Sequence, residues 1–182
     1  MPRYFAFLRA INVGGHVVKM DRLREIFEQL GFCGVETFIA SGNVVFESTS
    51  KNARALEKKA ETGLREGLGY EVATFIRTEA ELLEIANFQP FSKSKLAAAV
   101  TLNIVFLGET LSEEATKRTI ALRTDIDELQ VNGREIYWLC RKKQSESTIS
   151  NTVYNKTLGM PATIRGLNTL KRMAEQYCGS KK

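Results

Sequence analysis

The sequence predicts an α+β protein made of two ferredoxin-like halves, each a four-stranded antiparallel sheet with helices on one face. Three observations support this fold class. Apolar runs of strand length alternate with amphipathic segments of helical spacing. Their order within each half is βαββαβ, and that order occurs twice along the chain. We therefore expect an N-terminal domain over residues 1–95 and a C-terminal domain, ending in a basic helix, over residues 96–182.

The first half is predicted from residue periodicity and from the residues that start and stop helices. Thr78 and Glu81 have the spacing of a capping box, which predicts that a short helix begins just after Thr78. Gly31 is the expected stop of the first helix. The strands are expected over residues 4–9, 35–40, 44–47 and 70–77. The helices are expected over residues 20–30, 53–68 and 79–86.

The second half repeats this order after a join at Lys93-Ser94-Lys95. Asn132-Gly133 is a strong hairpin pattern between two predicted strands. Gly159, followed by Pro161, is typical of a helix end. The strands are expected over residues 99–107, 126–131, 134–140 and 162–165. The helices are expected over residues 112–122, 149–158 and 167–177.

The strand order brings two polar segments of the first half together. The first two strands of a βαββαβ unit run parallel, so the segments that follow them lie at the same end of the sheet. These segments are the loop Arg9–Lys19 and the turn Ser41-Gly42-Asn43. We therefore expect them to be neighbours in the fold.

The composition excludes several classes of protein. Hydrophobic residues make up 43% of the chain and charged residues 26%, which is typical of a globular protein. No apolar run is long enough to span a membrane, and the first residues are a strand rather than a signal peptide, so we expect a cytoplasmic protein. The three cysteines form no CxxC pair, and His16 is the single histidine. The sequence therefore indicates no metal site and no cofactor, and it identifies no catalytic residue.

The charge is concentrated toward the C-terminus. Residues 131–182 contain ten Lys or Arg and three Asp or Glu, a net charge of +7, whereas the whole chain carries +5. A basic segment attracts phosphates, nucleic acid or an acidic partner, although a solvated basic surface has the same composition.

Three motifs resemble those of a known family. Phe5–Gly15, followed by Lys19 and Met20, and then Thr37–Phe46 resemble the bacterial domain-of-unknown-function 1697 family. Leu158-Gly159 with Ala162–Thr169 is similar to a third motif of that family, with Gly166 in place of its usual Asn. The resemblance implies two ferredoxin-like domains and no established activity.

The candidate ligand-binding residues come from these motifs. Backbone N–H groups in a glycine loop before a helix, together with basic and amide side chains, can hold an anion. Glycines equally serve tight turns, and Asn168 or Thr169 could simply cap the last helix. The candidates are Arg9, Asn12, Gly14, Gly15, Lys19, Ser41, Asn43, Thr163, Arg165 and Asn168.

Three functional hypotheses are compatible with these residues. The first is a binding module for a phosphate-bearing partner, either nucleic acid or a phosphorylated small molecule such as a nucleotide. The second is an enzyme that uses neither metal nor histidine and acts on a small anionic metabolite, with Arg9 binding the anion and Asn12 and Asn43 polarising it. The third is that the motifs only stabilise the fold. RNA binding of the RRM type is disfavoured, because neither Val44–Phe46 nor Ile136–Trp138 matches the RNP1 pattern.

Overall fold

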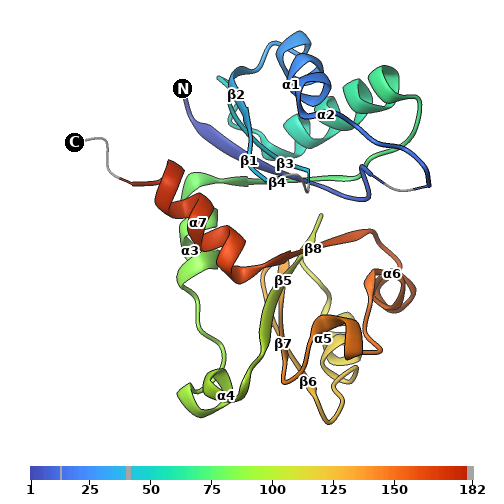
Figure 1. The fold of residues 1–182 in the computed structure, drawn as a ribbon, viewed down its shortest axis with the longest axis vertical. Helices are drawn as coiled ribbons and strands as arrows, with labels where there is room; N and C mark the ends of the chain where they lie inside the picture. Colours follow the sequence, from blue (N-terminus) through green and yellow to red (C-terminus); the bar gives the residue numbers. More distant parts are fainter. Residues whose placement is uncertain (13, 40–41, 180–182) are drawn as a thin grey trace. The chain divides into compact units, whose positions relative to one another are not determined.

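The computed structural model of the chain describes residues 1–12, 14–39 and 42–179 and divides into two compact units. One unit consists of Met1–Leu83 with the chain from Cys178 onward, and the other of Glu84–Tyr177 (Figure 1). The division falls inside helix α3 (Glu79–Asn87), not at the expected join between residues 95 and 96. The reason is that the end of α3 packs on the second sheet. The Tyr137 hydroxyl donates to the Ile85 carbonyl (3.4 Å), and the Tyr137 ring lies 5.1 Å from that of Phe88.

The first unit is a four-stranded sheet in the order β2-β3-β1-β4, with every pair of neighbours antiparallel. This is the expected ferredoxin-like topology, with two helices covering one face (Figure 1). Tyr4, Ala6 and Leu8 alternate toward those helices and pack with Phe27 and Leu64. The elements are β1 (Arg3–Leu8), α1 (Met20–Gln29), β2 (Cys33–Thr37), β3 (Asn43–Glu47), α2 (Ala53–Leu68) and β4 (Thr74–Thr78).

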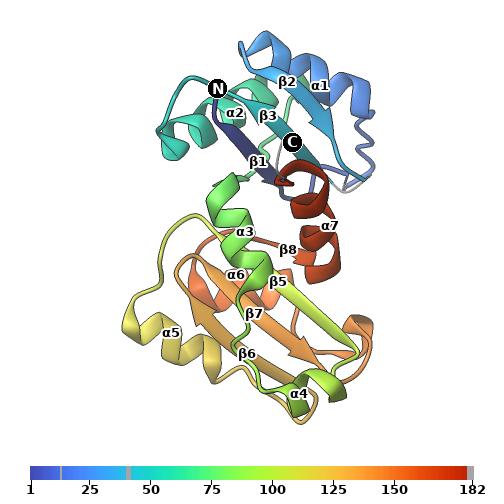
Figure 2. The ribbon, with the colours of Figure 1, turned by 90° about the vertical axis from the view of Figure 1, so that its left-hand side faces the viewer.

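The second unit has the same topology, in the order β6-β7-β5-β8, and is again antiparallel throughout. Its core contains Trp138, packed against Tyr154 and Val105, on the face that α5 and α6 cover (Figure 2). The elements are α4 (Lys93–Ala98), β5 (Thr101–Leu107), α5 (Glu113–Ile120), β6 (Asp127–Asn132), β7 (Glu135–Cys140), α6 (Asn151–Leu158), β8 (Ala162–Gly166) and α7 (Leu167–Tyr177).

Most predicted helix boundaries are confirmed by the hydrogen bonds that define them. The Glu81 N–H donates to Thr78 Oγ1 (3.2 Å) and the Thr78 N–H donates to Glu81 Oε2 (2.8 Å), which is the predicted capping box. Gly159 ends α6 in a left-handed conformation. Helix α4 was not predicted, although Ser92 caps it by accepting from the Lys95 N–H (3.4 Å).

Some strand boundaries differ from the prediction. Strand β2 ends at Thr37, and Ala40, its predicted end, lies outside the described residues. Strand β4 begins at Thr74 rather than at Tyr70. The hairpin loop of the second unit consists of Gly133 and Arg134, because Asn132 still pairs with Glu135.

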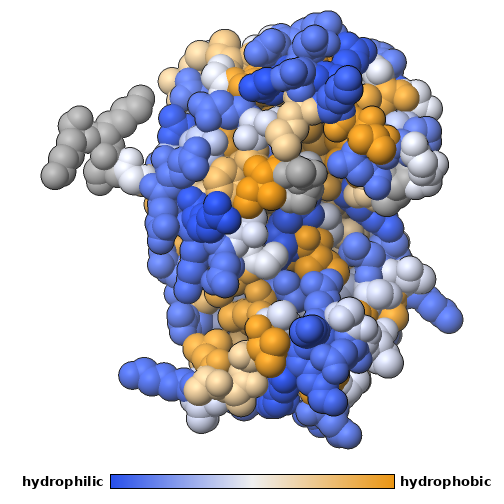
Figure 3. Space-filling model, in the orientation of Figure 1, coloured by the Kyte–Doolittle hydropathy of each residue, from blue (hydrophilic) through white to orange (hydrophobic). Residues whose placement is uncertain are grey.

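The aromatic residues of the third strands are part of the cores. Phe46 on β3 and Trp138 on β7 are fully buried and cannot stack on a nucleic-acid base. Within the described residues, none of the helices is both long and apolar enough to cross a membrane. Hydrophilic residues cover much of α1 (Figure 3).

Candidate functional site

The loop after β1 and the turn after β2 meet, as the strand order predicts. The Leu8 N–H donates to the Gly42 carbonyl (2.9 Å). Gly42 has a φ of +76°, and a Cβ built there would lie 3.0 Å from Ile11 Cγ2 and 3.2 Å from Leu8 Cβ. Only glycine accommodates both that backbone conformation and that close approach. Gly42 therefore allows the two segments to pack against each other.

Three contacts hold the loop in place. Asn12 Oδ1 accepts from the Val18 N–H (2.8 Å) and so closes the loop. The Tyr70 hydroxyl donates to the Ile11 carbonyl (2.7 Å). His16 stacks on Tyr70 with ring centroids 4.3 Å apart. His16, the single histidine of the chain, is thus exposed and packs on a tyrosine ring. Through Ile11 and His16, Tyr70 connects the loop to the segment before β4.

The tip of the loop presents backbone donors to solvent. Gly14 and Gly15 are exposed and left-handed, with φ of +63° and +82°. No described residue lies within 4 Å of a Cβ built at Gly15, which favours close approach of a ligand to the backbone there. Among the described residues, no hydrogen-bond acceptor is paired with the N–H groups of Gly14, Gly15 or His16. Lys19 is exposed at the start of α1, and Arg9 is half-buried.

The turn after β2 serves the fold. Asn43 is fully buried and donates from Nδ2 to the Phe38 carbonyl (3.0 Å), and the Phe38 N–H donates to the Asn43 carbonyl (3.0 Å). These bonds close the connection between β2 and β3. Ser41, the remaining candidate of this turn, lies outside the described residues.

A small hollow lies between the two segments. Its volume is about 10 Å³, and Asn12, Gly42 and Asn43 contribute to its wall together with Met20 and Ile39. This is about the space of one water molecule. The described residues around this hollow therefore enclose no space of metabolite size.

Two residues beside the hollow have an unusual backbone. Ala10 and Ile39 have positive φ values of 51° and 60°. For a β-branched residue such as Ile39 this conformation is a true outlier, and it costs about 1–3 kcal/mol. Both segments are thus held in conformations that their own residues do not favour.

The third motif lies in the second unit, at the junction of β8 and α7. Arg165 is buried and donates from Nη1 to Thr163 Oγ1 (2.8 Å) and to the Ile164 carbonyl (2.9 Å). Its burial lowers the pKa of the guanidinium to about 10. Helix α7 begins at Leu167, so Asn168 lies inside the first turn rather than at the capping position.

Sequence reasoning missed a buried carboxylate on β6. Asp127 accepts hydrogen bonds from Trp138 Nε1 (2.7 Å), Thr124 Oγ1 (2.7 Å) and Ser147 Oγ (2.8 Å). Burial raises the pKa of this carboxyl, but the hydrogen bonds together lower the pKa by more, so the net shift is downward. An acidic residue alone at a strand start gives no signal of such a network. Within residues 1–12, 14–39 and 42–179, no three His, Cys, Asp or Glu side chains are placed to bind a metal ion.

The fold defines the chain as an α+β protein of two ferredoxin-like units. It belongs to the family described as protein of unknown function (DUF1697), which matches residues 1–137. The third motif lies beyond the matched residues. Among solved structures, the conserved bacterial protein SP0830 from Streptococcus pneumoniae is similar, with a TM-score of 0.75, 24% identity, and coverage of 97% of this chain and 98% of that chain. No curated protein matches the chain.

Proposed function

We propose that the first unit binds a phosphate-bearing partner, nucleic acid or nucleotide, on the loop Arg9–Lys19. The observation that carries this proposal is the row of N–H groups at Gly14, Gly15 and His16, which are exposed and have no acceptor among the described residues. Consecutive backbone N–H groups in a tight glycine turn are a common way to bind a phosphate.

The charge of the loop supports the same ligand class. The segment Arg9–Lys19 contains two basic residues and no acidic one. Lys19 is exposed beside the start of α1, where the helix dipole also favours an anion. A phosphate at the loop tip would therefore meet hydrogen-bond donors and positive charge together.

The shape of the site favours binding at a surface over catalysis on an enclosed metabolite. The hollow that the described residues form beside the loop has a volume of about 10 Å³, far below the roughly 300 Å³ of a typical small-molecule pocket. The amide of Asn12 is bonded to Val18 and that of Asn43 to Phe38. These two side chains fit a structural role better than the polarising role that an enzyme would require.

The proposal is tested by titrating inorganic phosphate, adenosine 5′-monophosphate, and short DNA and RNA duplexes into ¹⁵N-labelled protein at two salt concentrations. We expect the amide signals of Gly14, Gly15 and His16 to move, with weaker binding at higher salt. Lys19→Gln should weaken binding. Lys58→Gln, which removes an exposed charge on α2, serves as the matched control. The proposal fails if these amides respond to none of the ligands, or if the two variants bind equally.

A further inference from the structure

The second unit contains a cavity that the proposed function does not use. It lies where α4, the start of β5 and the start of α7 meet, and its volume is about 420 Å³. This is within the range of small-molecule sites. All of its lining residues lie in the second unit, so the cavity is complete within one compact body.

One wall of the cavity is apolar. It is formed by Leu96, Ala99, Val100 and Leu102. Val100 is 60% exposed, and hydrophobic residues gather on the surface over α4 (Figure 3). An apolar group of a ligand would remove this surface from water.

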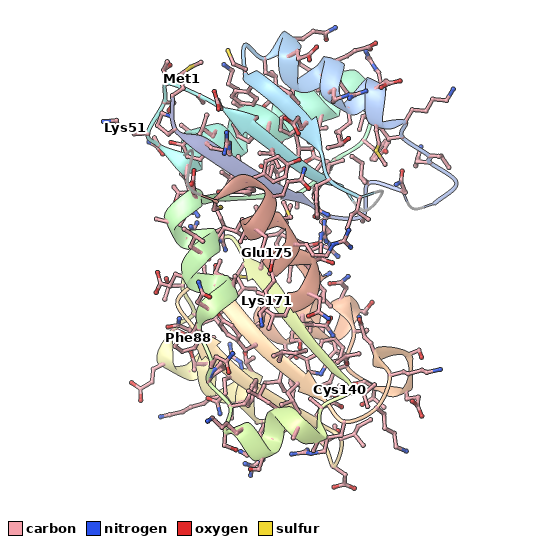
Figure 4. The ribbon with its side chains drawn as sticks, turned by 60° about the vertical axis from the view of Figure 1, so that its left-hand side comes forward. Met1, Lys51, Phe88, Cys140, Lys171 and Glu175 are labelled. Carbon is pink, nitrogen blue, oxygen red and sulfur yellow. The ribbon has the colours of Figure 1, made fainter. Side chains whose placement is uncertain are left out.

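Other residues that line the cavity are polar and carry hydrogen-bond donors. Lys171 is half-buried on α7 and pairs with no carboxylate among the described residues (Figure 4). The amide of Asn168 lies in the first turn of the same helix, whose N-terminus has a partial positive charge. None of the lining residues is acidic, so the only formal charge on the described wall is positive.

Asn103 provides the second, independent indication of a ligand. It lines the cavity, is 5% exposed, and its buried Nδ2 has no hydrogen-bond partner among the residues that the structure describes. A buried amide without an acceptor is destabilising, so such groups are rare unless something binds them. Gly166 is the neighbour of Asn103 across β5 and β8, and a Cβ there would lie 3.9 Å from Asn103 Oδ1. The missing side chain leaves space beside the amide.

We propose that this cavity binds a small organic anion, a carboxylate or phosphate monoester with a short apolar part. The anionic oxygens would accept from the Asn103 amide and the Lys171 ammonium, and the apolar part would lie against Val100 and Leu96. This site is independent of the loop in the first unit.

The test uses hexanoate and phenyl phosphate as probes and hexan-1-ol as the uncharged control. Trp138 pairs directly with Asn103 across β5 and β7 and is the single tryptophan of the chain, so its fluorescence reports on the site. We expect at least one anion to change this fluorescence saturably, to shift the side-chain amide signals of Asn103 and to raise Tm, and the alcohol to do none of these. Whether hexanoate or phenyl phosphate binds more tightly shows whether the site prefers a carboxylate or a phosphate group.

Two variants separate ligand binding from a structural role. Lys171→Gln should weaken anion binding by about tenfold, whereas Lys156→Gln, an exposed lysine on α6 outside the cavity, should not. Asn103→Leu should abolish binding and raise Tm, because it removes the unpartnered amide. The proposal is overturned if neither anion shifts the Asn103 amide, if both lysine variants bind equally, or if Asn103→Leu lowers Tm.

Discussion

Arg77 and Arg165 occupy the same position in the two units. Each is the fourth residue of the last strand of its sheet, and each donates from Nη1 to the carbonyl of the residue before it, at 3.0 Å to Ile76 and 2.9 Å to Ile164. In the registers, Arg77 lies opposite Phe5 and Arg165 opposite Ile104. The two units therefore share a buried arginine as well as a topology.

The two units differ two residues before the arginine. Arg165 donates to the hydroxyl of Thr163, whereas the equivalent residue of the first unit is Phe75, which has no hydroxyl. Thr163→Val keeps the shape of the side chain but removes the hydroxyl. We expect it to lower the free energy of unfolding by about 1–2 kcal/mol, because a buried guanidinium loses an acceptor. Chemical denaturation measures this change.

The control for this prediction is a double-mutant cycle. In an Arg165→Met background, Thr163→Val should have little effect, because no guanidinium needs the hydroxyl. Strictly additive effects of the two substitutions would show that the 2.8 Å hydrogen bond contributes nothing.

Asp127 should make the stability of the protein depend on pH at the acid end. Its pKa is lower in the folded state than the ordinary value of 3.8, since its hydrogen bonds outweigh its burial. The stabilisation is therefore complete above that ordinary pKa and is lost as the pH falls through the lower, folded-state value. We expect Asp127→Asn to lower the free energy of unfolding at pH 7 by about 1–3 kcal/mol and to flatten the decline below pH 4.

Denaturation curves at a series of pH values between neutral and acid conditions check this prediction. Glu128→Gln, on the same strand but half-buried, is the control, because its carboxyl contacts Lys95 and Arg141 nearer the surface. An unchanged acid slope in Asp127→Asn would contradict the prediction.

The sequence was sufficient to predict the topology, because alternating apolar residues and capping residues act locally. It also placed Gly42 beside the loop of Arg9–Lys19, since parallel strands end at the same side of a sheet. It could not predict the partners of Asn12 and Asn43, which depend on how each turn closes. The equivalence of Ile76-Arg77 and Ile164-Arg165 became clear only from the strand registers, because two identical residues are too short a match to be recognised as a repeat in the sequence.

Gly42 and Gly69 allow the packing of the loop to be tested. Both have left-handed backbones, with φ of +76° and +84°, but a Cβ at Gly69 meets no described residue within 4 Å. Both alanine variants therefore carry a backbone penalty of about 1–2 kcal/mol. Gly42→Ala should lose about a further 1 kcal/mol or more, because its Cβ would lie only 3.0 Å from Ile11 Cγ2 and 3.2 Å from Leu8 Cβ, so these side chains must shift. Equal losses of unfolding free energy in the two variants would show that the contact between the turn and the loop does not stabilise the fold.

Tyr70 should determine how well the loop is prepared for a phosphate. Its hydroxyl donates to the Ile11 carbonyl at 2.7 Å, while its ring stacks on His16 at 4.3 Å. Tyr70→Phe removes the hydrogen bond and keeps the stack, so we expect a loss of about 1 kcal/mol in unfolding free energy. Since a less ordered loop must be fixed when the ligand binds, the affinity for inorganic phosphate should also fall severalfold.

The amide signals of Gly14 and Gly15 measure that affinity, and Tyr70→Leu, which also removes the stack, should bind more weakly still. The pH provides a further check. Burial raises the pKa of Tyr70 above 10, so the hydrogen bond to Ile11 should persist up to pH 10 and be lost as the pH rises through the folded-state value. Phosphate binding by the wild-type protein should then fall below that of Tyr70→Phe, because the phenolate loses the hydrogen bond and also repels the anion. If Tyr70→Phe binds phosphate as tightly as the wild type, the hydroxyl stabilises the fold without organising the loop for a ligand.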